Sequence, residues 1–246
     1  MTAPLVLLHG FTQTGASWAP VRDHLRLDPP RELLTPDQRG HGAASEVRPV
    51  VLPAMAADAM AQVPGGSEVA LAGYSMGGRA ALLAAIASPG RVTHLALIST
   101  TAGIENDAER ARRAAADESL ADRMQRLTVE QVVDDWAAQP LFAGQTQQVA
   151  AFAREDRLRS TPAGLAASLR GAGTGRMGSL WGSLGTLTMP ALVLVGERDV
   201  KFRAIGERLA AALPAADYVV VPDAGHQLPL EAPAAVAREL ERLLAR

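Results

Sequence analysis

Short apolar stretches recur along the chain and alternate with longer stretches in which apolar and polar positions follow a helical spacing. The apolar stretches are almost continuous, which is typical of strands buried on both faces of a parallel sheet. Strands that alternate with amphipathic helices predict an α/β fold with right-handed crossovers. We expect strands at residues 4–10, 32–37, 68–73, 93–99, 190–196 and 218–222.

Helices are expected between these strands, at residues 15–27, 53–62, 76–88, 203–213 and 232–245. Residues 102–185 interrupt the alternation, because their pattern predicts helices and no strand. We therefore expect a core made of residues 1–101 and 186–246, in a mostly parallel sheet flanked by helices. Residues 102–185 would form a helical lid inserted between two strands of that sheet, within a single structural domain.

The composition limits the classes of function that are open to the chain. Its 246 residues, 48% of them hydrophobic, suffice for a large core. A formal net charge of −2 gives no overall field that would attract nucleic acid or an anionic membrane. No cysteine is present, and the five histidines lack the spacing of a zinc site. With no leader and no membrane-length apolar run evident, we expect a cytoplasmic protein without membrane insertion.

The sequence LAGYSMGGRA carries the first sign of chemistry. Gly73, Ser75 and Gly77 fit the Gly-x-Ser-x-Gly pattern of a sharp strand-to-helix turn that presents a reactive serine. Asp199, in GERD, and His226, in DAGH, follow the ends of two later strands. Serine, aspartate and histidine in this order are typical of an α/β-hydrolase triad, in which the histidine takes the serine proton and the aspartate holds the histidine.

The first predicted strand ends in HGF, at the point where α/β-hydrolases place one donor of the oxyanion hole. We predict that the backbone N–H groups of Phe11 and Met76 form this hole, because Met76 directly follows the serine. His9 is expected to organise the loop rather than to take part in the chemistry.

Two positive charges are predicted to border the pocket. Arg79 lies four residues after Ser75 and so shares its helix face, and Lys201, the only lysine, lies two residues after Asp199. For both residues, a solvated surface position is the alternative. Trp136, in DDWAAQPLF, is either a pocket wall or the anchor of the lid core, and burial statistics favour the anchor.

A wider likeness is carried by the segments LHGFTQTGASW, GYSMGGRAALLAA, ERARRAAADESLA, DDWAAQPLF, GLAASLRGAGTG, LVGERDVKF and AGHQLPLEAP. Together they resemble the 2-succinyl-6-hydroxy-2,4-cyclohexadiene-1-carboxylate synthases of menaquinone biosynthesis, which have the α/β-hydrolase fold but are not hydrolases. The likeness covers nearly the whole chain, including the predicted lid, whereas the triad motifs alone would indicate only the superfamily. One departure is the turn PDQRGHG, where such proteins more often have proline or leucine before GHG.

The resemblance implies a role for individual residues. The catalytic residues would be Ser75, Asp199 and His226, the oxyanion donors Phe11 and Met76, and the substrate-binding residues Tyr74, Arg79, Arg113, Trp136, Arg159 and Lys201. For the lid arginine at Arg113, the neighbouring Arg112 leaves the register open by one residue.

The resemblance also implies an activity, the elimination of pyruvate from a small-molecule substrate with three carboxylates. The reaction needs no metal or organic cofactor. The residues alone leave two alternatives open: a serine hydrolase acting on an ester, lactone or thioester, and a non-catalytic binding protein with a hydrolase-like pocket. The oligomeric state does not follow from the sequence.

Overall fold

A six-stranded parallel sheet lies at the centre of the computed structural model, which describes residues 2–246. Its strands are β1 (Leu5–Leu8), β2 (Leu33–Leu34), β3 (Val69–Tyr74), β4 (Val92–Ile98), β5 (Ala191–Gly196) and β6 (Ala216–Val221). Their order across the sheet is β2-β1-β3-β4-β5-β6. All six strands occur where the apolar stretches predicted them, and the α/β class of the fold is confirmed.

The second strand is shorter than predicted, because only Leu33 and Leu34 pair with β1. Pro36, two residues further on, has no N–H to offer to the sheet. The chain there passes directly over Gly15, where a Cβ would lie 1.9 Å from the carbonyl oxygen of Thr35. The rest of the predicted strand is therefore a loop that leads toward the carboxyl edge of the sheet.

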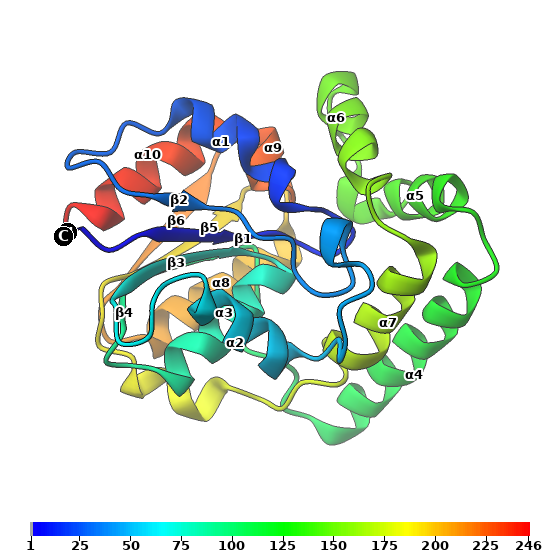
Figure 1. Ribbon diagram of the computed structural model, residues 1–246, viewed down its shortest axis with the longest axis horizontal. Helices are drawn as coiled ribbons and strands as arrows, with labels where there is room; N and C mark the ends of the chain where they lie inside the picture. Colours follow the sequence, from blue (N-terminus) through cyan, green and yellow to red (C-terminus); the bar gives the residue numbers. More distant parts are fainter. Residues whose placement is uncertain (1) are drawn as a thin grey trace.

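Helices cover both faces of the sheet (Figure 1). One face packs against α2 (Leu52–Ala61), α3 (Met76–Ala87) and α8 (Val200–Ala212), and the other against α1 (Ala19–His24) and α10 (Pro233–Leu244). The short α9 (Leu228–Glu231) precedes α10. Each face has its own apolar cluster, since strand residues point alternately to the two sides.

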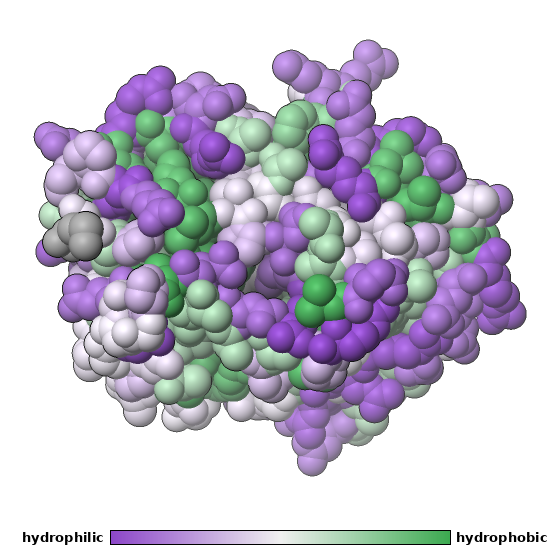
Figure 2. Space-filling model, in the orientation of Figure 1, coloured by the Kyte–Doolittle hydropathy of each residue, from purple (hydrophilic) through white to green (hydrophobic). Residues whose placement is uncertain are grey.

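Four further helices lie between β4 and β5, beyond the carboxyl ends of the strands (Figure 1). We call them the helical insert: α4 (Asp107–Met124), α5 (Val129–Ala137), α6 (Gln147–Arg157) and α7 (Pro162–Ala172). Each begins after a side chain that accepts a hydrogen bond from the backbone N–H three residues later, at Asn106, Thr128, Thr146 and Thr161. Hydrophilic residues cover the outer side of α4 in Figure 2, and its few buried residues face the other insert helices.

The helical insert is joined to the sheet by a buried carboxylate. Asp156, on α6, accepts hydrogen bonds from the backbone N–H of Thr14, at 3.0 Å, and from the Thr14 hydroxyl. Burial raises the pKa of Asp156, while the two donors oppose that effect by favouring its charged form. Ser160 adds a second link, because its hydroxyl accepts the N–H of Gly42. The insert is thus tied to the loops that follow both β1 and β2.

None of the helices within residues 2–246 combines the length and the apolar composition that crossing a membrane would require.

Replacing Asp156 by alanine is expected to lower the free energy of unfolding by about 2–4 kcal/mol, because two buried donors of Thr14 lose their acceptor. Asp134→Ala is the matched control, since its ion pair with Arg154 is exposed on the surface and should contribute less than about 1 kcal/mol. Urea unfolding of the three proteins measures the difference. Equal losses in the two variants would show that the Thr14 contact does not hold the insert.

Candidate active site

Ser75 sits in a turn that only glycines on either side permit. Its backbone has a φ of 51°, a left-handed value that residues with side chains rarely adopt. A Cβ on Gly73 would lie 2.3 Å from the carbonyl oxygen of Gly77, and one on Gly77 would lie 2.2 Å from that of Leu8. The turn is therefore packed between β3, α3 and the end of β1, and the Gly-x-Ser-x-Gly pattern is explained by contact rather than by flexibility.

Ser75 begins a series of hydrogen bonds across three strand ends. Its Oγ lies 3.2 Å from Nε2 of His226, and Nδ1 of His226 lies 2.6 Å from Oδ2 of Asp199. In the neutral imidazole, Nδ1–H donates to the carboxylate and Nε2 accepts the serine hydroxyl. The loops of Asp199 and His226 meet because Gly196 packs against the carbonyl oxygen of Gly225, where a Cβ would lie at 2.2 Å.

Ser75 and His226 open into a cavity of about 360 Å³ between the sheet and the helical insert. Six other residues predicted for the site also line it: Phe11, Met76, Arg79, Arg113, Trp136 and Lys201. Further polar wall groups come from Thr100, Thr101, Gln139, Ser168 and Thr174. The fold thus brings together residues from the loop after β1, from α3, from the insert helices α4, α5 and α7, and from α8.

Phe11 and Met76, the residues of the predicted oxyanion donors, line the same cavity as Ser75. Because Gly77 packs on the carbonyls of Leu8 and His9, the first turn of α3 lies against the loop that carries Phe11. Within residues 2–246, neither the Phe11 nor the Met76 N–H donates a hydrogen bond. Both groups are therefore available to an oxygen atom bound beside Ser75.

Two arginines on the wall of the cavity are held in place by neighbouring groups. Arg79 is buried, and its Nη1 donates to the carbonyl oxygen of Ala172 at 2.5 Å. Burial, and then the nearby Arg113, lower the pKa of Arg79 to about 10, so that it stays charged at neutral pH. Arg113 is held by Asp117, whose Oδ1 lies 2.8 Å from the guanidinium Nε. Arg113 lines the cavity and Arg112 does not, so the geometry favours residue 113 at this position.

Trp136 and Lys201 complete the wall. The Trp136 ring meets Phe11 edge-on at 4.9 Å and also packs against the apolar cluster of the insert, so it is both a cavity wall and an anchor. Lys201 is exposed to solvent at the mouth of the cavity, with its Nζ 5.8 Å from the centre of the Phe202 ring.

Two predicted substrate-binding residues do not line the cavity. The Tyr74 ring is buried in the apolar cluster on the α1 side of the sheet. Its centre lies 5.4 Å from that of the His226 ring, so it packs against the histidine outside the cavity. Arg159 points away, with 63% of its side chain exposed and its closest acid, Asp156, at 4.0 Å.

The buried arginine of this segment is Arg157, which the sequence reasoning missed. It is 2% exposed, lies 4.7 Å from the centre of the Phe142 ring, and donates from Nη2 to Gln227 at 3.4 Å. The helical spacing contains the signal: positions 153, 156 and 157 share the buried face of α6, and position 159 lies beyond the end of the helix.

Comparisons with known proteins agree with this geometry. A model described as "Alpha/beta hydrolase family" matches residues 5–239. A Bacillus subtilis (strain 168) protein, named provisionally as a 2-succinyl-6-hydroxy-2,4-cyclohexadiene-1-carboxylate synthase, is 37% identical over 93% of this chain and 85% of its own. A Salmonella heidelberg (strain SL476) protein with that name, unqualified, is 31% identical over 98% of this chain and 93% of its own. The chain belongs to this synthase family of α/β-hydrolase proteins.

A solved structure described as MenH from S. aureus extends the similarity to three dimensions. It superposes with a TM-score of 0.90 at 29% identity, covering 100% of this chain and 94% of the other. The resemblance to the synthase family and the α/β-hydrolase fold are therefore both confirmed.

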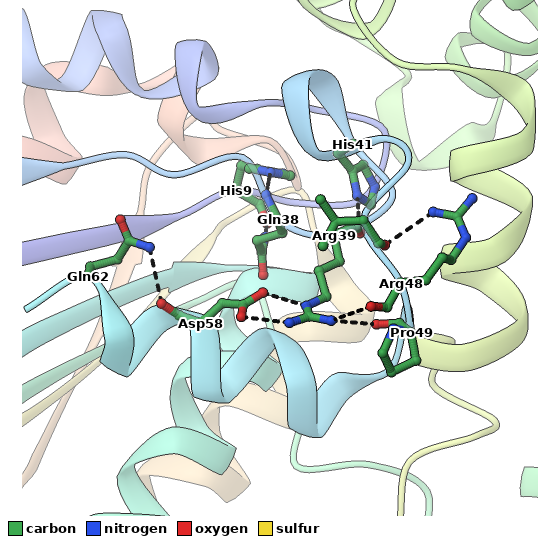
Figure 3. A network of polar contacts seen from close by, with 9 residues as sticks. His9, Gln38, Arg39, His41, Arg48, Pro49, Asp58 and Gln62 are labelled. Atoms are coloured by element: carbon green, nitrogen blue, oxygen red, sulfur yellow. Dashed lines mark hydrogen bonds and ion pairs between the residues drawn. The ribbon is translucent and has the colours of Figure 1, made fainter.

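In this member of the synthase family, the loop that carries Phe11 rests on two buried histidines. His9 accepts the N–H of Gln38 at Nε2, at 2.9 Å (Figure 3). Its Nδ1 donates to the carbonyl oxygen of Gly10, also at 2.9 Å, so the ring is neutral. Burial lowers the pKa of His9 to about 4. The ring of His41 lies 5.1 Å from that of His9 and 5.6 Å from that of Phe11.

An ion pair fixes the loop that carries His41. Arg39 binds both carboxylate oxygens of Asp58, on α2, and donates to the carbonyls of Arg48 and Pro49 (Figure 3).

Burial, and then the nearby His9, lower the pKa of His41 to about 3. Neutral imidazoles are thus part of the packing that supports the loop of Phe11.

This packing predicts a pH dependence of stability. Because the folded chain keeps His41 neutral, the unfolded chain takes up the proton first as pH falls below about 6.5, and stability drops down to about pH 3. Each such histidine adds a slope of at most about 1.4 kcal/mol per pH unit. Denaturant unfolding gives the free energy of unfolding at pH 6 and at pH 5. The decrease in this free energy between the two pH values should be smaller for His41→Gln than for the wild type. His24→Gln, at an exposed position of α1, should keep the wild-type slope, and an equal slope in His41→Gln would contradict the prediction.

Proposed function

We propose that this protein acts as a 2-succinyl-6-hydroxy-2,4-cyclohexadiene-1-carboxylate synthase in menaquinone biosynthesis, eliminating pyruvate from 2-succinyl-5-enolpyruvyl-6-hydroxy-3-cyclohexene-1-carboxylate. One observation carries the proposal: a serine hydrogen-bonded to a histidine opens into a cavity with cations on its wall and at its mouth. Membership of the synthase family supports the choice of substrate.

The charges of the cavity match those of the proposed substrate. That substrate has three carboxylates, on its enolpyruvyl group, its succinyl chain and its ring. Arg79 and Arg113 offer guanidinium groups that can bind carboxylates through paired hydrogen bonds, and Lys201 adds an ammonium at the mouth. Low solvent exposure at Arg79 strengthens such contacts, because fewer water molecules compete for the charge.

The proposed chemistry begins with a proton on carbon. Between the substrate and product rings, C2 loses a hydrogen, the C3–C4 double bond becomes C2–C3 and C4–C5 double bonds, and the C5–oxygen bond breaks. In our proposal, His226 takes the hydroxyl proton of Ser75, and the serine oxygen removes the hydrogen at C2, next to the succinyl ketone. The electron pair of that bond passes into the ketone as an enolate.

The enolate then collapses and expels the leaving group. Its oxygen would be held by the N–H groups of Phe11 and Met76, which stabilise the negative charge as it forms. As the diene forms, the C5–oxygen bond breaks and the enolate of pyruvate departs. The proton held by His226 returns to this leaving group, which becomes pyruvate, and Ser75 keeps the hydrogen taken from C2. Asp199 stabilises the transient imidazolium through Nδ1–H.

A serine hydrolase of the same fold is the alternative, since one triad serves both chemistries. In a hydrolase, the oxygen of Ser75 would attack a carbonyl carbon and form an acyl-enzyme. The charged wall favours the elimination, because a simple ester has no carboxylates for Arg79 and Arg113 to bind.

Replacing Ser75 by alanine is expected to reduce pyruvate release by roughly 1,000-fold or more, because the proposed base is lost. The substrate should be made fresh by the preceding enzyme, and uncatalysed decay must be subtracted. Ser88→Ala, at the other end of α3, is the control that should keep wild-type activity. Equal rates for the wild type and Ser75→Ala would end the proposal.

The adjacent arginines of α4 offer a matched pair. Arg113→Ala should raise KM for the tricarboxylate by roughly 10- to 100-fold, because a charged hydrogen bond to a carboxylate contributes about 1.5–3 kcal/mol. Arg112→Ala removes the same charge one residue away, outside the cavity, and should change KM less than about threefold because its effect is only long-range and screened. Steady-state kinetics on both variants decides whether the cavity wall binds the substrate carboxylates.

A further inference from the structure

The loop that carries His226 is held by one buried carboxylate. Glu231, at the end of α9, accepts the backbone N–H of Gly225 at Oε2, at 2.7 Å, and that of Gln227 at Oε1, at 2.9 Å. These are the residues directly before and after His226. The side chain of Glu231 is 5% exposed, so water does not readily replace these contacts.

The same carboxylate reaches the loop of Asp199. Arg198 donates from Nη2 to Oε2 of Glu231 at 3.0 Å, and its own backbone N–H donates to the carbonyl of Ala224 at 2.9 Å. Glu231 therefore contacts residues adjacent in sequence to both His226 and Asp199, whose side chains are hydrogen-bonded to each other. An ion pair with a guanidinium also offsets the cost of burying the carboxylate.

A third contact comes from the helical insert. Gln145, which lies just before α6, donates from Nε2 to Oε1 of Gln227 at 2.8 Å and to Oε1 of Glu231 at 3.3 Å. Four donors from three segments thus converge on Glu231: two backbone N–H groups, Arg198 and Gln145. Only a carboxylate can accept all four, because an amide has one oxygen and a nitrogen that donates.

We propose that Glu231 is a positioning residue that fixes the imidazole of His226 against Ser75 without touching the substrate. The hydrogen bond that Nε2 of His226 accepts from Ser75 is 3.2 Å long, whereas the bond between Nδ1 and Asp199 is 2.6 Å long. Movement of the 225–227 backbone would therefore weaken the contact to the serine first. The inference rests on the proposed catalytic role of Ser75 and His226, but not on the identity of the substrate.

The test replaces Glu231 by glutamine, which keeps the shape but removes one acceptor and the charge. We expect kcat for pyruvate release to fall roughly 10- to 100-fold, since a misplacement near 1 Å can cost that much, with KM within about twofold of wild type. Labelling of Ser75 by a fluorophosphonate should slow by a similar factor. Glu239→Gln is the matched control, because Glu239 is also buried and ion-paired, with Arg238 and Arg242 on α10.

Wild-type labelling by a folded Glu231→Gln protein would overturn the proposal. Thermal unfolding beside Glu239→Gln shows whether the variant is folded. If Glu231→Gln is not folded, labelling of Arg198→Ala tests the proposal instead, because this variant keeps the carboxylate of Glu231 but removes the guanidinium that pairs with it. Labelling of Arg198→Ala roughly 3- to 10-fold slower than wild type supports the positioning role, and an unchanged rate refutes it. Because labelling needs no natural substrate, a wild type that labels but releases no pyruvate would refute the proposed function alone.

Discussion

Close packing between the end of β1 and the first turn of α3 is the contact on which the site depends. Gly77 lies so near the carbonyls of Leu8 and His9 that no side chain fits, and Gly73 meets the backbone of Gly77 in the same way. These contacts leave Ser75 in a left-handed conformation at the carboxyl edge of the sheet. They also place the N–H groups of Phe11 and Met76 beside one cavity. A single larger residue in this turn would displace the serine and the proposed oxyanion donors together.

The helical insert supplies part of the charged and aromatic wall of the cavity. Arg113 and Trp136 come from the insert, and Arg79, from α3, is capped by the insert carbonyl of Ala172. Burying a guanidinium is costly, and here the carbonyl and the nearby Asp117 reduce that cost only in part. An anionic ligand would offset the remainder. This charge balance supports the proposal that the cavity binds a carboxylate rather than a neutral group of the same size.

The sequence predicted the parts of the site that have a local signal. Strand ends, the glycines around Ser75 and the order of Asp199 and His226 follow from patterns that span a few residues. Arg159, which the family resemblance implied, is exposed and does not line the cavity, whereas the helical period favours Arg157 as the buried arginine, on one face of α6 with Ala153 and Asp156. The link from Asp156 to Thr14 has no such signal, because its partners are 142 residues apart and meet only in the folded chain.

The charges on the cavity wall explain how, in the proposed function, one hydrogen-bonded serine can serve elimination rather than acyl transfer. The distances among Ser75, His226 and Asp199 do not distinguish the two reactions, since both begin with the loss of the hydroxyl proton to the imidazole. What differs is the atom that lies within reach of the serine oxygen. Carboxylates held by Arg79 and Arg113 would fix the ring of the proposed substrate in the cavity. That grip would present a C–H bond to the oxygen and leave the neighbouring ketone oxygen, rather than a scissile carbonyl, for the N–H groups of Phe11 and Met76. In the proposed function, the charged wall then decides which reaction occurs, and Ser75 with His226 supplies only the base.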